Sequence, residues 1–100
     1  MSSLAKLAEW YLEQCDGLWE HHYWRISLKT LDNPGFFLEI NLLGTPLEHK
    51  PFAEVRLDCD SETHWIHCSV KDHQFIGGCS ADRIDETIDI FLGWAHEGLQ

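Results

Sequence analysis

The sequence predicts an α+β domain in which an antiparallel sheet is covered by two helices. Three observations indicate this: apolar residues recur at helical spacing near both ends of the chain, they alternate in the segments between, and the breaks between those segments carry turn residues. Connections of hairpin length cannot carry the crossovers that parallel strands require. We therefore expect a meander of four to five antiparallel strands packed against an N-terminal and a C-terminal helix.

The first helix is expected over residues 3–15. Its apolar residues recur three or four positions apart, as on one face of a helix; they are Leu4, Leu7, Ala8, Tyr11, Leu12 and Cys15. Asp16 and Gly17 follow directly, and glycine at this place is typical of a helix end because it adopts positive φ without strain. The chain is therefore predicted to turn at Gly17.

Two strands are expected next, over residues 23–31 and 36–43, with a turn at residues 32–35 between them. The turn reads Asp-Asn-Pro-Gly, and we expect Gly35 to have positive φ and to set the register of the hairpin. The second strand alternates in character, so one of its faces is predicted to be core. That face carries Phe36, Leu38, Ile40 and Leu42.

Two further strands are expected over residues 53–58 and 64–71. Their inward residues are predicted to be Val55, Leu57, Ile66, Cys68 and Val70. Trp65 falls on the opposite face, where it is either covered by a helix or exposed as an anchor for a partner. A short fifth strand is predicted over residues 74–76, before the glycine pair at 77–78.

A closing helix is expected to begin after Ser80, a suitable N-cap residue, and to end before Gly98. Its inward stripe consists of Ile84, Ile88, Phe91, Leu92 and Ala95. Trp10 and Trp94 flank the stripes of the two helices, so we expect both to pack in the core.

The length of the chain suits a single domain with one core, and we assign residues 1–100 to it. No apolar run is long enough to span a membrane, and the N-terminus shows no cleavable signal pattern. We therefore expect a cytoplasmic protein. Its four cysteines, Cys15, Cys59, Cys68 and Cys79, show no CxxC spacing and are expected to be reduced.

The chain is strongly acidic, with 17 Asp and Glu residues against 7 Lys and Arg residues and a formal net charge of −10. Binding of nucleic acid is disfavoured, because phosphate contacts need lysine and arginine. Two groups of carboxylates are concentrated late in the sequence: Asp82, Asp85, Glu86 and Asp89 on the closing helix, and Asp58, Asp60 and Glu62 at a strand turn. Each group is either a solvated face or a docking surface for a basic protein.

Patterns for catalysis or metal binding are weak in this sequence. His64 and His67 lie on opposite faces of the expected strand, and no second pair of ligands supports a zinc site. Cys79 near the start of the closing helix is the most suggestive thiol, because a helix N-terminus lowers a thiol pKa. A phosphate-binding loop beginning at His67-Cys68 would need arginine six residues after Cys68, where Gln74 stands, and the arginine spacing of a persulfide-forming loop is missing around Cys79. We therefore expect no catalytic residue, no cofactor and no metal, and interpret Cys79 as structural.

Several blocks of the sequence together resemble one family. They are Trp10-Tyr11, Gln14-Cys15-Asp16-Gly17 and Trp19-Glu20-His21; Thr30-Leu31-Asp32-Asn33-Pro34-Gly35; Leu42, Gly44-Thr45, Leu47-Glu48 and Lys50-Pro51-Phe52; Trp65-Ile66; and Ile90-Phe91-Leu92 with Trp94-Ala95. These blocks look like the immunity protein 53 family of bacterial polymorphic toxin systems, over nearly the whole chain. The sequence departs from that family at Trp24, where a smaller residue is expected, and at Phe36, where tryptophan is usual.

The resemblance implies a protein that binds and neutralises a cognate toxin and has no active site of its own. It does not identify the toxin, although an acidic inhibitor suits a basic nuclease. The expected partner-binding residues are Asp58, Asp60, Glu62, Trp65, Asp82, Asp85, Glu86 and Asp89. Two alternatives are a small-molecule- or metal-binding module that uses the histidines and tryptophans, and a thiol enzyme centred on Cys79.

Overall fold

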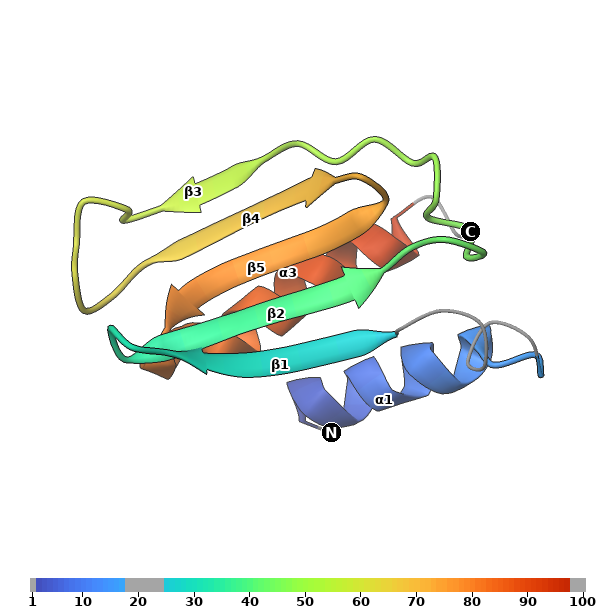
Figure 1. The fold of residues 1–100 in the computed structure, drawn as a ribbon, viewed down its shortest axis with the longest axis horizontal. Helices are drawn as coiled ribbons and strands as arrows, with labels where there is room; N and C mark the ends of the chain where they lie inside the picture. Colours follow the sequence, from blue (N-terminus) through green and yellow to red (C-terminus); the bar gives the residue numbers. More distant parts are fainter. Residues whose placement is uncertain (1, 18–24, 98–100) are drawn as a thin grey trace.

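A computed structural model describes residues 2–17 and 25–97 of the chain. Its elements, in chain order, are α1 (Ser3–Gln14), β1 (Ile26–Leu31), β2 (Gly35–Asn41), β3 (Val55–Leu57), β4 (Ile66–Lys71), β5 (Gln74–Ser80), the 3₁₀ helix η1 (Ala81–Arg83) and α3 (Ile84–His96). Five strands form one antiparallel sheet; α3 lies behind its centre, and α1 packs against α3 beside β1 (Figure 1). The predicted α+β class is confirmed. Tyr23, Trp24 and Gly98, used in the predicted boundaries, lie outside the described residues.

The strand order is β1-β2-β5-β4-β3, so the prediction of one continuous meander is wrong. A hairpin of β1 and β2 is followed by a separate run of β3, β4 and β5, and β5 returns to pair with β2. The connection over residues 42–54 explains the difference, because it is longer than a hairpin loop and carries the chain to the far edge of the sheet. The last strand therefore becomes the central one.

β5 is longer than the predicted strand, because it continues through Gly77 and Gly78 to Ser80. The two glycines allow close approaches from opposite faces of the sheet. A Cβ at Gly77 would lie 2.7 Å from Cγ2 of Thr87 on α3, and a Cβ at Gly78 would lie 3.3 Å from the ring of Trp65. The glycine pair thus lets a helix and an indole ring lie directly on the central strand, rather than ending it.

The helix ends agree with the sequence in one case and differ in the other. Ser2 caps α1 by accepting a hydrogen bond from the backbone N–H of Ala5, and Gly17 has the expected positive φ of 91°. Ser80 does not cap α3. It is the last residue of β5, its hydroxyl donates to Asp82 Oδ1 at 2.6 Å, and η1 separates it from the helix. The predicted cap is therefore wrong, because β5 extends to Ser80 and η1 lies between Ser80 and the start of α3.

Two further predictions about single residues are wrong. Gly35 is not among the residues with positive φ; it is required because a Cβ there would overlap the backbone carbonyl oxygen of Cys79 on the neighbouring strand. Leu57 is 39% exposed rather than inward, because β3 has only three residues and forms the outer edge of the sheet. Strand alternation alone does not tell how far a helix covers an edge.

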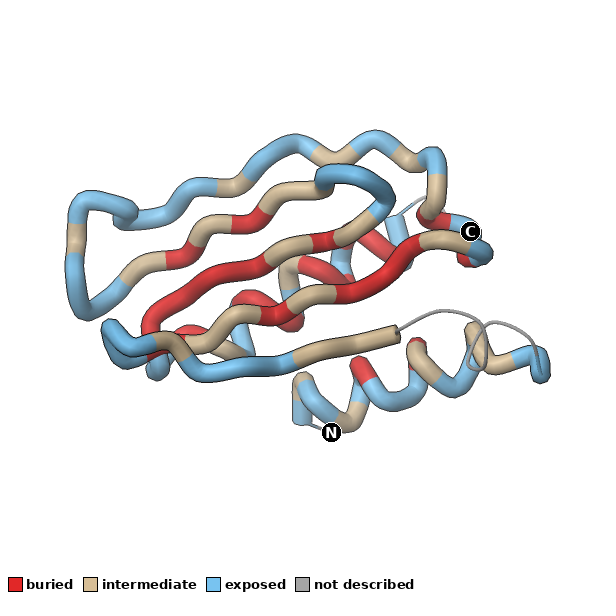
Figure 2. The backbone as a smooth tube through the Cα atoms, in the orientation of Figure 1, coloured by how far each residue is buried: buried red, intermediate tan, exposed pale blue. Residues whose placement is uncertain are grey.

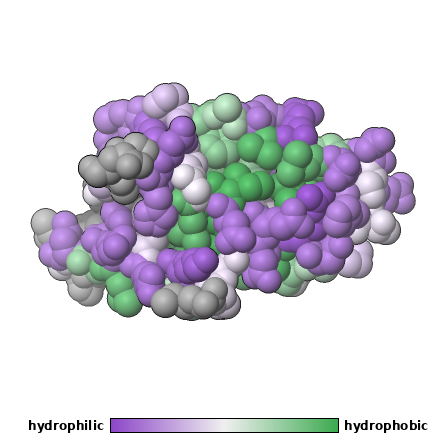
Figure 3. Space-filling view, turned by 180° about the vertical axis from the view of Figure 1, so that it is seen from behind, coloured by the Kyte–Doolittle hydropathy of each residue, from purple (hydrophilic) through white to green (hydrophobic). Residues whose placement is uncertain are grey.

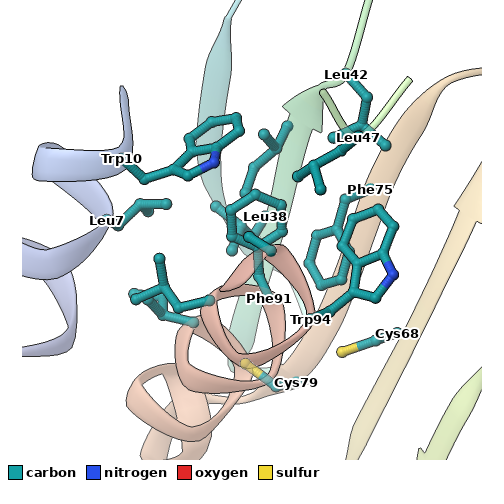
Figure 4. Packing of buried hydrophobic residues seen from close by; sticks show 14 of the residues in the cluster. Leu7, Trp10, Leu38, Leu42, Leu47, Cys68, Phe75, Cys79, Phe91 and Trp94 are labelled. Atoms are coloured by element: carbon teal, nitrogen blue, oxygen red, sulfur yellow. The ribbon is translucent and has the colours of Figure 1, made fainter. Parts of the chain in front are cut away.

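The core lies between the sheet and the two helices, and Figure 2 shows buried residues concentrated in β2 and β5. Trp10 and Trp94 are 4% and 7% exposed, which confirms their predicted packing. The Trp10 ring meets the Phe91 ring edge to face with centroids 4.9 Å apart, and Cys68 and Cys79 lie under α3 (Figure 4).

Seen from the helix side, hydrophobic residues reach the surface in the middle of the molecule, framed by hydrophilic ones (Figure 3). No helix in the described ranges is long and apolar enough to cross a membrane.

Candidate protein-binding surface

Three connections meet at one end of the sheet. In an antiparallel sheet successive connections alternate between the two ends, so the β1–β2 turn, the β3–β4 loop and the start of α3 all lie at the same end, at the left of Figure 1. Two of these segments, residues 58–64 and 80–86, are here called the acidic end. They contain six carboxylates and one arginine, so with neutral histidine their charge is 1 − 6 = −5, half of the formal net charge of −10.

Arg83 joins the two acidic groups that the sequence presented separately. Its side chain is 9% exposed, and its guanidinium donates to Asp58 Oδ2 at 3.0 Å across the two segments. It also donates to both carboxylate oxygens of Glu86, at 3.1 and 2.8 Å. A planar guanidinium is suited to this bidentate geometry. The β3–β4 loop and the start of α3 are therefore held together by one nearly buried cation.

A second set of contacts links the same two segments through Asp82. His64 Nδ1 lies 2.8 Å from Asp82 Oδ2, and the Ser80 hydroxyl donates to the other oxygen. The Ser80 hydroxyl oxygen accepts from the backbone N–H of Trp65 at 3.1 Å, which fixes the point where the loop enters β4. Asp82 is therefore part of a network that shapes the surface.

Two of the carboxylates in these contacts, Asp82 and Glu86, are held in their ionised form. Two hydrogen bonds from Arg83 lower the pKa of Glu86 below its usual range. Hydrogen bonds from Ser80, and then from His64, lower the pKa of Asp82. The pKa of Arg83 is raised, chiefly because its hydrogen bonds to Glu86 favour the charged form. Glu86 and Asp82 therefore stay ionised to lower pH than ordinary carboxyl groups do.

The remaining predicted acids divide into two classes. Asp60, Glu62 and Asp85 are exposed, and among the described residues no ion pair or side-chain hydrogen bond is recorded for any of them. Asp89 lies elsewhere, because its carboxylate accepts a hydrogen bond from the Ser3 hydroxyl at 2.7 Å and so ties α3 to the start of α1. The structure thus brings together six of the seven predicted carboxylates, and three of the six take no part in holding the fold.

Trp65 borders the acidic end on the face of the sheet away from the helices. It is half-buried, and its ring lies over Gly78 of β5, so its body is packed while an edge remains accessible. Of the two readings that the sequence left open for this tryptophan, burial under a helix is wrong, because the helices cover the other face. Such a half-exposed aromatic residue next to charged groups is typical of a binding anchor.

A small recess of about 230 Å³ opens at the same end. The β1–β2 turn contributes Asn33 and Pro34 to it, and the acidic end contributes the rest of its lining, which is Glu62, Thr63, Ala81 and Asp82. Sequence reasoning missed both the part played by this turn and the link made by Arg83. The part played by the β1–β2 turn could have been found by counting strands. Because connections alternate between the two ends of an antiparallel sheet, this turn, the β3–β4 loop and the start of α3 must lie at the same end.

The alternatives centred on thiols and metals find little support in the described part of the chain. Cys79 lies within β5 rather than at a helix start, and burial raises its thiol pKa instead of lowering it. Burial likewise raises the pKa of Cys68 to about 12. His64 contacts Asp82 and His67 contacts Glu54, each at 2.8 Å, so the two histidines do not share a partner. Within residues 2–17 and 25–97 no group of three or more His, Cys, Asp or Glu side chains is arranged to hold a metal ion.

Comparison with known proteins assigns a family to residues 4–96. Searches of curated proteins and of solved structures each returned no match. The family model described as immunity protein 53 matches residues 4–96, which include all of β1 to β5 and nearly all of both helices. Membership of such a family implies neutralisation of a cognate toxin, although the match does not identify that toxin. The chain belongs to the immunity protein 53 family.

Proposed function

We propose that this protein neutralises its cognate toxin by binding the toxin domain directly, without catalysis, and that the acidic end with Trp65 is the surface that binds. The observation that carries the proposal is the concentration of charge: half of the formal net charge lies on 14 residues at one end of the sheet. A surface of one sign attracts an oppositely charged partner from a distance and aligns it before contact. The partner is accordingly a toxin domain with a basic surface.

The division among the carboxylates supports this assignment. Asp58, Asp82 and Glu86 hold the loop and the helix start in place, whereas Asp60, Glu62 and Asp85 project without a recorded partner. Like charges held close together oppose folding slightly, so unpaired carboxylates on a rigid frame are typical of residues that serve a partner. A basic nuclease suits such a surface, since its active site must attract phosphate, and the encounter would take place in the cytoplasm of the producing cell.

The test replaces the three unpaired acids together, as Asp60→Asn, Glu62→Gln and Asp85→Asn. We expect unchanged or slightly raised thermal stability, affinity for the toxin domain weaker by about 10-fold or more, and loss of protection in cells that express the toxin. Most of the loss should be in the association rate at low salt, because the removed charges act over distance.

A matched control changes the charge equally at another place. Glu9→Gln, Glu13→Gln and Glu97→Gln together also remove three exposed carboxylates, but from α1 and from the residue that follows α3. Binding weakened equally by both triple variants would mean that net charge alone matters, and undiminished protection by the first variant would remove the acidic end as the binding surface. If the unaltered protein does not bind its cognate toxin domain, direct inhibition itself is wrong.

A further inference from the structure

The edge strand β1 and the helix α1 together leave a position for one more strand. Among the described residues β1 pairs only with β2 and forms one edge of the sheet. In Figure 1, α1 lies beside β1 and beyond it, while α3 covers the centre of the sheet. A strand added to β1 at the usual spacing of about 4.8 Å would therefore run in front of α1. We infer that an extended segment of the cognate toxin binds there as a sixth strand, an inference that rests on the proposed function.

The hydrogen-bonding groups at this edge can be assigned from the register. The backbone N–H of Asn41 donates to the carbonyl of Arg25 at 2.8 Å, and the pairing continues as Ile26 with Ile40 and Leu28 with Leu38. Hydrogen-bonded pairs alternate in an antiparallel ladder, so the odd-numbered residues of β1 face β2 with their N–H and C=O groups. The N–H and C=O groups of Ile26, Leu28 and Thr30 therefore point toward the free edge, where a partner strand would bond to them.

An apolar groove lies between α1 and the start of the same edge. It has a volume of about 320 Å³ and lies between the helix and the strand, lined by Leu4, Leu7, Ala8, Tyr11, Arg25 and Ile26. Leu4 is 58% exposed, and Leu28, whose side chain shares the helix-facing side of β1 with Ile26, is 47% exposed. Leu4 lines the helix wall of the groove, and Leu28 lies just beyond the lining along β1, so together they extend the exposed apolar surface. Every second side chain of an added strand would point into this groove and cover them.

Charge favours a toxin segment over a second copy of this chain. Each copy has a formal net charge of −10, so two copies repel one another, whereas a basic toxin domain is attracted. The edge is continuous with the acidic end, because β1 leads directly into the turn that lines the recess there. A basic toxin domain held at the acidic end is thus already beside β1. The segment that fits has apolar residues at alternate positions.

Amide exchange measured by NMR tests this position directly. In the free protein the amides of Ser27 and Lys29 should exchange slowly, because they bond to β2, while those of Leu28 and Thr30 exchange fast. With the purified toxin domain at saturation, Leu28 and Thr30 should slow by about 10-fold or more, and Ser27 and Lys29 should change little. Unchanged exchange at Leu28 and Thr30 in a complex that forms normally would overturn the inference and leave the proposed function standing.

A pair of substitutions gives an independent test. Leu28→Lys places a charge on the helix-facing side of the β1 edge, next to the groove, and should weaken toxin binding by about 10-fold or more. Leu12→Lys, on an exposed leucine of α1 that neither lies on β1 nor lines the groove, should change it less than about twofold. Equal affinities of the two variants would overturn the inference. So would a dimer of the unaltered protein, seen by light scattering, that Leu28→Lys converts to a monomer, since the occupant would then be a second copy. Absence of any toxin binding would instead count against the proposed function.

Discussion

The two ends of the sheet use polar side chains in opposite ways. At the acidic end, half of the carboxylates are exposed without a recorded partner. The other end comprises residues 42–54, 72–73 and the C-terminus of α3. There, polar side chains donate hydrogen bonds to backbone carbonyl groups. Lys50 Nζ donates to the carbonyls of Trp94 and Glu97 at 2.6 and 2.7 Å, and Trp94 Nε1 donates to the Pro51 carbonyl at 2.8 Å.

The difference separates structural residues from residues available to a partner. A lysine at the last carbonyls of a helix satisfies acceptors that the helix leaves open and complements its dipole. The long connection is thereby fastened to α3, which explains how it crosses to the far edge and remains ordered. Removing a polar group at this end should therefore cost stability, whereas removing an unpaired carboxylate at the acidic end should cost binding.

The largest effect on folding is expected for Lys50→Met. This change keeps most of the side chain's length but removes two charge-assisted hydrogen bonds, and it should lower the free energy of unfolding by about 2–3 kcal/mol. Denaturant unfolding measures the loss, and affinity for the toxin domain should not change in the folded fraction. Lys71→Met, at an exposed lysine of the same end, is the control and should change stability by less than about 0.5 kcal/mol. Equal losses in the two variants would contradict the structural role of Lys50.

A smaller and pH-dependent effect is expected for Glu86→Gln at the acidic end. Because Arg83 lowers the pKa of Glu86 in the folded state, the pair contributes stability above the ordinary carboxyl pKa, and this contribution is lost as pH falls through the lowered value. The variant should melt at a lower temperature than the unaltered protein at pH 7, and the difference should shrink as pH falls below the ordinary carboxyl range. Melting curves across that pH range measure it. Asp85→Asn, with no recorded partner, is the control and should change the melting temperature little at pH 7; a difference for Glu86→Gln that persists at low pH would exclude the ion pair as its cause.

Much of this fold follows from local patterns in the sequence. The helices, the hairpin turn and the inward faces of β2 and β4 are set by spacing, and these were predicted because each depends on neighbours a few residues away. Strand order depends instead on which strand is best buried on both faces. The glycines of β5 looked like a strand end, but they mark the centre of the sheet because Thr87 and Trp65 lie against them.

The candidate site was predictable in part for the same reason. Sequence showed that Asp58 and Glu86 belong to acidic groups, and could not show that a single arginine holds both, because that contact joins residues 25 positions apart. Nor could it separate carboxylates that hold the fold from those that do not. That distinction depends on which side chain each carboxylate contacts in three dimensions. Asp89, for example, is not part of the acidic end, because it accepts a hydrogen bond from the Ser3 hydroxyl on α1.

The smallest effect compares two aspartates with the same backbone. Asp58 at the acidic end and Asp72 at the opposite end both have φ of 53°, in the left-handed region that asparagine occupies more readily than aspartate. Asp72→Asn should therefore raise the free energy of unfolding by about 0.5 kcal/mol, because nothing in the described structure pairs with this side chain. Asp58→Asn relieves the same backbone but gives up the charged partner of Arg83, so its stability should fall. Denaturant unfolding of both variants measures the expected rise in the free energy of unfolding for Asp72→Asn and the expected fall for Asp58→Asn. A gain at both positions would show that Arg83 depends on Glu86 alone, and that the β3–β4 loop is not fastened to α3 through Asp58.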